Sequence, residues 1–204
     1  MDHRRAWQHR IQAQLFHQGV EKRSGLLTTA GRAHLDTAEL SPAGRQLIEM
    51  ALRIIDTLGA EADVVRRELQ AFARRQPGCR ALVDELYGVG ELTAAIIWAE
   101  MGDTRRFSST QAVRHTGLDI TVWDSDEKRA PGRLSRQGPA ALRWALFEAA
   151  LAAARTTSPD HGYYLEVADR LGTKRAYLSV ARKLARRAHH ILRRLGDTAF
   201  TEVP

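Results

Sequence analysis

The sequence predicts a mainly α-helical protein. A long coiled-coil-like helix precedes a helical domain with a helix-hairpin-helix-like motif and a small β-hairpin or loop insertion. Apolar residues recur at helical spacing along most of the 204 residues, and proline and glycine divide the chain into helix-sized segments. One polar segment, 118–143, breaks that spacing. Its alternating residues 120–123 and the turn sequence at 129–133 predict the hairpin.

We expect three regions, namely an N-terminal linking region (1–42), a long helical arm (43–76) and a C-terminal helical domain (77–204). A helix is expected over 4–18, and 20–42 is expected to be irregular because it holds two glycines and a proline.

The sequence predicts a helix start at Ser41-Pro42, because Ser41 supplies a capping hydroxyl and Pro42 suits the first helical position. It ends before Pro77-Gly78. Its apolar residues follow a seven-residue rhythm that Glu61 and Glu68 interrupt. They are Leu47, Ala51, Ile54, Leu58, Val65 and Phe72. A single apolar stripe on so long a helix favours pairing with another chain, and packing on its own domain is the alternative.

The charge is unevenly distributed. The formal net charge is +7, and residues 128–195 carry 15 Lys+Arg against 4 Asp+Glu, whereas the remainder carries 16 against 20. A basic half fits a polyanionic partner such as nucleic acid, and a solvated surface is the alternative.

A single cysteine, Cys79, excludes a disulfide framework and a zinc site built on several cysteines. The sequence has no apolar run of about 18 residues and no signal sequence, so we expect a cytoplasmic protein without a membrane partner.

Gly88-Val89-Gly90 lies between two apolar helical segments. Two glycines around one aliphatic residue permit a tight turn, which would leave backbone amides of the next helix, near Thr93, facing outward to hold a phosphate. This resembles the helix-hairpin-helix motif of DNA-repair proteins. A purely structural αα-hairpin is the alternative.

A short helix is expected over 109–115, and three more over 139–155, 163–171 and 173–195. The last has an apolar seam at alternating four and three spacing. The seam comprises Tyr177, Ala181, Leu184, Ala188, Ile191 and Leu195. Its outer face carries Arg182, Lys183, Arg186, Arg187, Arg193 and Arg194. Six cations without an acid in this helix favour contact with phosphates.

Other chemistry has little support in the sequence. The eight histidines lack metal-site spacing, and His189-His190 face different sides of a helix. The loop acids Asp124, Asp126 and Glu127 are typical of solvated residues, with a metal or serine-positioning role as the alternative. No metal ligand is therefore assigned.

Four segments carry a resemblance to a known family: YGVGELTAAIIWAEMGDTRRFSS, HTGLD, WDSDEKRAPGRLSRQGPAALRWALFEAA and RAYLSVARKLARRAHHILR. Together they resemble the C-terminal part of insertion-sequence-110 family transposases, over about residues 80–195. Residues 1–75 resemble the family's linking region and coiled-coil arm.

The resemblance implies a DNA recombinase with a composite active site. An N-terminal RNase H-like domain would bind magnesium through four acidic residues, and a bridge RNA would guide the choice of DNA. The C-terminal domain would supply a serine that forms a phosphoserine link to DNA. No part of this sequence resembles that N-terminal domain, so we expect the chain to be inactive alone, with no cofactor of its own.

By resemblance, the nucleophile falls on Ser125. The family has Ser-Gly at this place and this chain has Ser125-Asp126, which adds a negative charge where glycine would let a phosphate approach. The family's Ser-Lys-x-Gly element becomes Ser135-Arg136-Gln137-Gly138.

The candidate phosphate-binding residues are Gly88, Gly90, Thr93, Arg105, Arg106, Arg129, Arg133, Ser135, Arg136, Arg143, Arg182, Lys183, Arg186 and Arg187. The expected partners are DNA, a guide RNA and further copies of the chain through the long helix. The alternative function is a non-enzymatic, regulatory nucleic-acid-binding module.

Overall fold

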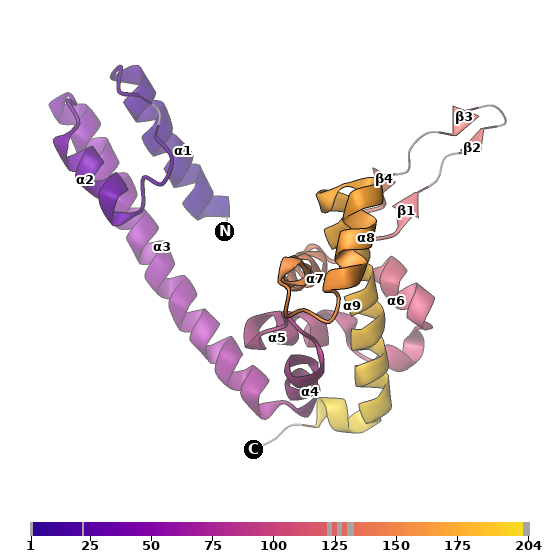
Figure 1. Ribbon diagram of the computed structural model, residues 1–204. Coiled ribbons are helices and arrows are strands. Elements are labelled where there is room, and N and C mark those ends of the chain that lie inside the picture. The colour runs from indigo at the N-terminus through magenta and orange to yellow at the C-terminus, as the bar shows by residue number, and fades with distance from the viewer. Residues whose placement is uncertain (1, 22, 122–123, 126–127, 130–132, 202–204) are drawn as a thin grey trace. The chain divides into compact units, whose positions relative to one another are not determined.

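The computed structural model describes residues 2–21, 23–121, 124–125, 128–129 and 133–201 (Figure 1). For seven of these it describes the backbone alone: Asp2, Thr121, Asp124, Ser125, Lys128, Arg129 and Arg133. The described chain is mainly α-helical, which confirms the fold class. It forms two compact units, Met1–Arg66 and Arg67–Pro204.

The first unit contains α1 (Asp2–His17), α2 (Thr29–Thr37) and most of α3 (Pro42–Arg75). Its core consists of Ile11, Leu15, Leu26, Leu35, Ile48, Ala51 and Ile55. These residues come from all three helices and from the segment before α2, so burial of their side chains holds the helices together.

Helix α2 corrects the expectation that 20–42 is irregular. Thr28 begins it, because its hydroxyl accepts a hydrogen bond from the Gly31 amide at 3.1 Å. A Cβ at Gly31 would lie 2.1 Å from the Gly25 carbonyl oxygen. The glycine that looked like a helix breaker is therefore needed inside the helix, where the preceding loop crosses it closely.

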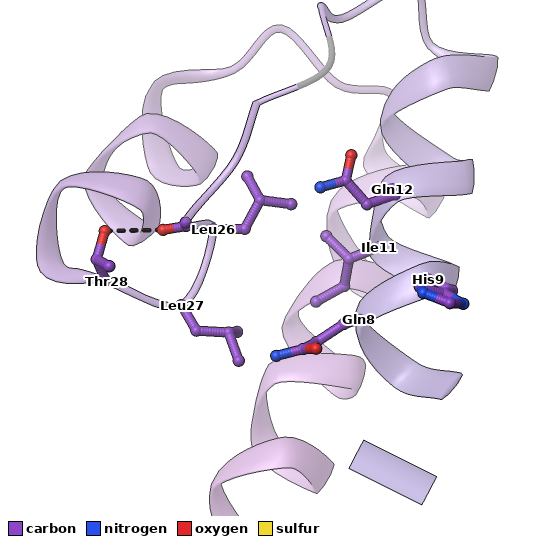
Figure 2. A pocket seen from close by; sticks show the side chains of 8 residues that line it. Gln8, His9, Ile11, Gln12, Leu26, Leu27 and Thr28 are labelled. Carbon is purple, nitrogen blue, oxygen red and sulfur yellow. Dashed lines mark hydrogen bonds between the residues drawn. The ribbon is translucent and has the colours of Figure 1, made fainter. Parts of the chain in front are cut away.

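A hollow of about 370 Å³ in this unit lies between α1 and the loop before α2 (Figure 2). Figure 2 shows Ile11, Leu26 and Leu27 beside the amide side chains of Gln8 and Gln12. The described lining contains no carboxylate or arginine that would activate a reaction, and its only titratable side chain is His9.

The second unit is built from helices around α9. They are α4 (Pro77–Glu85), α5 (Glu91–Met101), α6 (Ser109–His115), α7 (Ala140–Leu151), α8 (His161–Leu171) and α9 (Thr173–Leu195). Short 3-10 turns lie at η1 (Thr104–Arg106), η2 (Ala152–Ala154) and η3 (Gly196–Phe200). Helix α9 packs against α4, α6, α7 and α8 (Figure 1).

The apolar seam expected on α9 is confirmed, because Ala181, Leu184, Ala188 and Ile191 are buried in the core of this unit. Cys79 is also fully buried there, and burial raises the pKa of its thiol to about 12. The cysteine is therefore a small core residue, protonated at neutral pH, and not a reactive one.

Between α6 and α7 the chain forms four two-residue strands. Strand β1 (Ile120–Thr121) pairs antiparallel with β4 (Arg133–Leu134), and β2 (Asp124–Ser125) pairs antiparallel with β3 (Lys128–Arg129). In sequence the β2–β3 pair lies between β1 and β4, so the β1–β4 pair forms the base of the segment.

No helix among the described residues is both long enough and apolar enough to cross a membrane.

The segments on either side of the strands cross at two glycines. A Cβ at Gly138 would lie 1.9 Å from the His115 carbonyl oxygen and 2.7 Å from the Gly117 amide nitrogen. Gly117 itself has a φ of +67°, and a Cβ there would lie 2.7 Å from the Gly138 amide nitrogen. Only glycine at both positions permits this approach of one backbone to the other.

We expect Gly138→Ala to lower the free energy of unfolding by about 1–3 kcal/mol or more, because the added methyl group overlaps backbone atoms that cannot move aside. Gly162→Ala in α8 is the control, since a Cβ there meets nothing within 4 Å. Urea denaturation followed by circular dichroism measures both changes. Equal stability of the two variants would contradict the role of the crossing.

Candidate functional site

The base of the strand segment is closed by hydrogen bonds between residues 117–119 and 135–136. The Ser135 amide donates to the Asp119 carbonyl oxygen at 3.0 Å, and the Ser135 hydroxyl donates to the Asp119 carboxylate. The Arg136 amide donates to the Gly117 carbonyl oxygen at 3.1 Å. Arg136 has a φ of +54°, which is uncommon for a residue with a side chain, and its own side chain is exposed.

Two arginines of neighbouring helices hold this base in place. Arg143 of α7 donates to the carbonyl oxygens of Thr116 and Gly138, at 3.2 and 3.0 Å. Arg182 of α9 donates through Nε to the Leu118 carbonyl oxygen at 2.6 Å. Burial lowers the pKa of Arg182 from its ordinary value. Both residues thus satisfy partly buried carbonyl groups, a role that the sequence pattern does not reveal.

Ser125 lies in β2, where its backbone is opposite Lys128, and Asp124 is opposite Arg129. The side chains of Ser125, Arg129 and Arg133 are not among those described, and Asp126 and Glu127 lie outside the described residues. Pairing of β2 with β3 brings the backbone of the candidate nucleophile next to two basic positions of the sequence.

The Gly88-Val89-Gly90 turn joins α4 to α5. Gly88 has a φ of +86°, and a Cβ there would lie 2.5 Å from the Ala149 carbonyl oxygen of α7. Gly90 is exposed with open space around its Cα. Its amide donates to the Thr93 hydroxyl at 2.9 Å, so this donor already has a partner.

The first glycine is therefore needed for packing, and the second leaves room for another molecule. The first residue of α5, Glu91, forms an ion pair with Arg74, with 3.6 Å between Glu91 Oε1 and Arg74 Nη1. That carboxylate adds a negative charge at the helix start, which opposes the approach of a phosphate.

Arg105 and Arg106 of η1 are exposed but have partners. Arg105 pairs with Asp103 at 2.9 Å and Asp197 at 3.0 Å, and these contacts raise its pKa. Arg106 donates to the Met101 carbonyl oxygen at 3.1 Å, and its guanidinium carbon lies 4.5 Å from the centre of the Phe107 ring.

Two cations of α9 meet a buried carboxylate from another helix. Asp160, just before α8, is 3% exposed. It accepts from Lys183 Nζ at 3.0 Å and from Arg187 Nη1 at 2.6 Å. Burial alone would raise the Asp160 pKa, but the hydrogen bonds and charges of Arg187 and Lys183 outweigh it and hold the pKa below its ordinary value.

Further along α9, Arg194 pairs with Glu85 of α4, and Arg193 donates to the Phe107 carbonyl oxygen at 3.0 Å. Arg186 is exposed. The basic face is thus partly neutralised by acids distant in sequence. The sequence Ser158-Pro159-Asp160 is typical of a helix start, which is the only signal for Asp160 in the sequence. It does not indicate that the carboxylate pairs with α9.

The candidate residues therefore fall into separate groups in the fold. Ser135, Arg136, Arg143 and Arg182 meet at the base of the strand segment. Lys183 and Arg187 gather at Asp160, whereas Arg105 and Arg106 lie on η1. The glycine turn at 88–90 abuts α7. The sequence predicts a phosphate-binding role for all of these residues, whereas their contacts in the fold divide them into separate groups.

Among the described side chains, no three of the His, Cys, Asp and Glu type come together as ligands for a metal ion. The loop acids considered in the sequence, Asp124, Asp126 and Glu127, have no described side chains.

We expect Asp160→Asn to lower the free energy of unfolding by about 1–3 kcal/mol, since two charged hydrogen-bond donors lose their carboxylate. The side chains of Lys183 and Arg187 are 36% and 42% exposed, so water screens part of the loss. Asp169→Asn, an exposed acid of α8, the helix that follows Asp160, is the control.

The stabilisation by Asp160 is present above the pKa of an unfolded aspartate, about 3.9, and disappears as the pH falls through the lower folded-state pKa. The stability difference between the native protein and Asp160→Asn should therefore narrow below about pH 4. Denaturation at a series of pH values measures it, and a constant difference would argue against the ion pairs.

Residues 80–165 match the family model described as Transposase IS116/IS110/IS902 family. No curated protein matches this chain. The matched segment contains the glycine turn, η1, the strand segment with Ser125, both crossing glycines and Asp160, and it ends within α8. The match supports an insertion-sequence transposase of the IS110 type, with a role in transposition of an insertion sequence.

Proposed function

We propose that this chain binds DNA during transposition and that Ser125 forms a covalent link to a DNA phosphate when the chain acts with a magnesium-binding catalytic domain. The support is the family match over 80–165 together with the resemblance of the segment around Ser125 to the family's serine loop. The observation that carries the proposal furthest is the closed base of the strand segment, which fixes both ends of the loop that contains Ser125.

The hydrogen bonds of Ser135, Arg143 and Arg182 hold the segment at 117–119 and 135–138, so the loop begins and ends on a rigid helical scaffold. Catalytic groups need such support, because small displacements of a reacting atom lower the rate steeply. Ser135 has an anchoring contact in the fold, which favours Ser125 as the reacting serine.

In the proposed step, the Ser125 hydroxyl oxygen forms a bond to phosphorus and its proton passes to a base. The bond from phosphorus to one sugar oxygen breaks, and that oxygen takes up a proton as it leaves as a hydroxyl. The phosphate remains a diester, now between Ser125 and DNA. Nearby cations stabilise the charge that builds up on its free oxygens.

Lys128, Arg129 and Arg133 are the cations of this chain closest in sequence to Ser125, and Arg136, further along, is exposed. Arg143 and Arg182 are assigned a positioning role instead, because they hold backbone carbonyl groups. Magnesium would be held by acidic residues of the catalytic domain and would activate the oxygens that react. A guide RNA as the selector of DNA rests on the family resemblance.

The long helix is proposed to join copies of the chain. Residues 61–69 of α3 are all exposed, and Val65 is 53% exposed although it lies on the apolar stripe. Other residues of the stripe have partners within their own unit, since Ala51 is buried and the rings of Phe72 and Trp98 lie 5.5 Å apart. The central part of the stripe is thus the surface offered to a second helix.

Ser125→Ala should abolish a covalent protein–DNA adduct in a chain joined to a magnesium-binding catalytic domain of this family, because no oxygen remains to attack phosphorus. A DNA substrate nicked near the cleavage site traps the adduct, and denaturing gel electrophoresis detects it. Ser135→Ala is the comparison variant: it removes the hydroxyl that bonds to Asp119 but keeps the Ser125 oxygen, so it should lower the yield of the adduct without abolishing it.

Loss of the adduct in Ser135→Ala but not in Ser125→Ala would overturn the serine assignment. If neither the native chain nor its variants form an adduct but all bind DNA, the alternative function, a non-enzymatic nucleic-acid-binding or regulatory module, replaces the proposal.

Val65→Glu should weaken self-association about tenfold or more, because a charge would be buried between two helices. Ala60→Glu is the control, as it lies about 140° around the helix from Val65 at 100° per residue and is also exposed. Light scattering at several protein concentrations measures the mass. A native chain that is monomeric throughout would contradict pairing through this helix.

A further inference from the structure

A small groove lies where the base of the strand segment meets α8 and α9. Its volume is about 110 Å³, and it is lined by Ile120, Leu134, Leu171, Arg175, Leu178, Ser179 and Arg182. Ile120 is 51% exposed and Leu171 is 43% exposed. Aliphatic side chains on both walls, open to solvent, favour a flat apolar group from another molecule.

The polar groups of the groove are basic or neutral. Arg175 and Arg182 are both among its lining residues, and that lining has no carboxylate among the described residues. Asp119, next to Ile120, has its carboxylate engaged by the Ser135 hydroxyl. An occupant that combines an apolar ring with negative charge would therefore meet complementary surfaces.

Charge at the start of α9 points the same way. Helix N-termini favour anions, and acidic side chains in the first turn usually satisfy them. Helix α9 has no acidic residue in its first turn and carries Lys174 and Arg175 there. Both are exposed, and Gly172, before the helix, has open space around its Cα. Cations at a helix N-terminus interact unfavourably with the helix dipole and so lower the stability of the helix. Here they also create a positively charged site that attracts phosphate.

We propose that the groove binds one base turned out of a DNA duplex, with its neighbouring phosphate at the first turn of α9. The base lies between the aliphatic walls, and the guanidinium of Arg175 packs on its face or contacts its phosphate. A single base attached to a phosphate matches a groove that is small, apolar and rimmed by cations. This inference rests on the proposed function in DNA binding.

The position of the groove connects it to the serine loop. Ile120 and Leu134 are partners across β1 and β4, and they form one wall of the groove. Arg182 lines it and also holds the Leu118 carbonyl oxygen. A base in the groove thus contacts the same residues that support the loop of Ser125, so DNA binding and loop orientation are coupled.

The test compares the affinity of the purified chain for two DNA duplexes of the same sequence, one fully paired and one with a single unpaired nucleotide. Fluorescence anisotropy gives both dissociation constants. A fluorescent aminopurine at the unpaired position reports entry of the base into the groove. The native chain should prefer the duplex with the unpaired base by about tenfold, as a stacking contact implies.

Leu171→Glu places a charge in the apolar wall and should remove the preference and the aminopurine signal. Leu165→Glu is its matched control, because Leu165 is 52% exposed on the same helix but does not line the groove. Arg175→Ala should also remove the preference. Lys174→Ala, next to it, should weaken binding to both duplexes alike.

Equal affinity of the native chain for the two duplexes overturns the base-binding groove while leaving the proposed DNA binding intact. Absence of binding to either duplex overturns both. A preference that survives Leu171→Glu and Arg175→Ala places the unpaired base elsewhere. Tighter binding to an RNA duplex with the same unpaired base would replace DNA as the occupant.

Discussion

The close crossing of Gly117 and Gly138 is the constraint on which the rest of the second unit depends. It brings the end of α6 and the start of α7 into backbone contact, so the chain between them must leave and return at one place. Arg143 and Arg182 donate to carbonyl groups at this crossing, which ties α7 and α9 to it. A side chain at either glycine would push the two backbone segments apart and weaken these three hydrogen bonds.

Helix α9 packs in the core through one face and carries closely spaced basic residues on the other. Its small apolar residues, such as Ala181, Ala185 and Ala188, allow close packing in the core. Its basic residues would repel one another if they were left alone. Asp160 relieves that repulsion between Lys183 and Arg187, and Glu85 does so for Arg194. The formal charge of a segment therefore overstates the charge offered to a partner.

Local patterns in the sequence predicted most of the helices, because apolar spacing and capping residues act over one or two turns. The helices at 109–115 and 173–195 have the expected bounds, and the long helix Pro42–Arg75 differs by one residue at each end from the arm expected at 43–76. Helix α2 was missed because Gly31 breaks helices locally but is required there by a tertiary contact.

Within the candidate site, the pairing of Lys183 and Arg187 with Asp160 spans more than 20 positions, beyond the reach of any local pattern. The same is true of Arg182 and the Leu118 carbonyl group. Residue types at a site are readable from sequence, whereas the division of cations between structural and exposed roles depends on tertiary packing.

The hydrogen bonds between Asp119 and Ser135 close the segment at its base. The stability of the helical core therefore depends little on which residues the loop beyond them contains. The entropy cost of joining the two ends rises slowly with loop length, by about 0.6 kcal/mol for each doubling. The helical core is anchored outside the loop, and its residues on either side are Leu118 and Leu142. Residues 121–133 can therefore be lengthened, shortened or substituted at little cost to the folding free energy of the helical core, so this segment can change in sequence while the surrounding fold is kept.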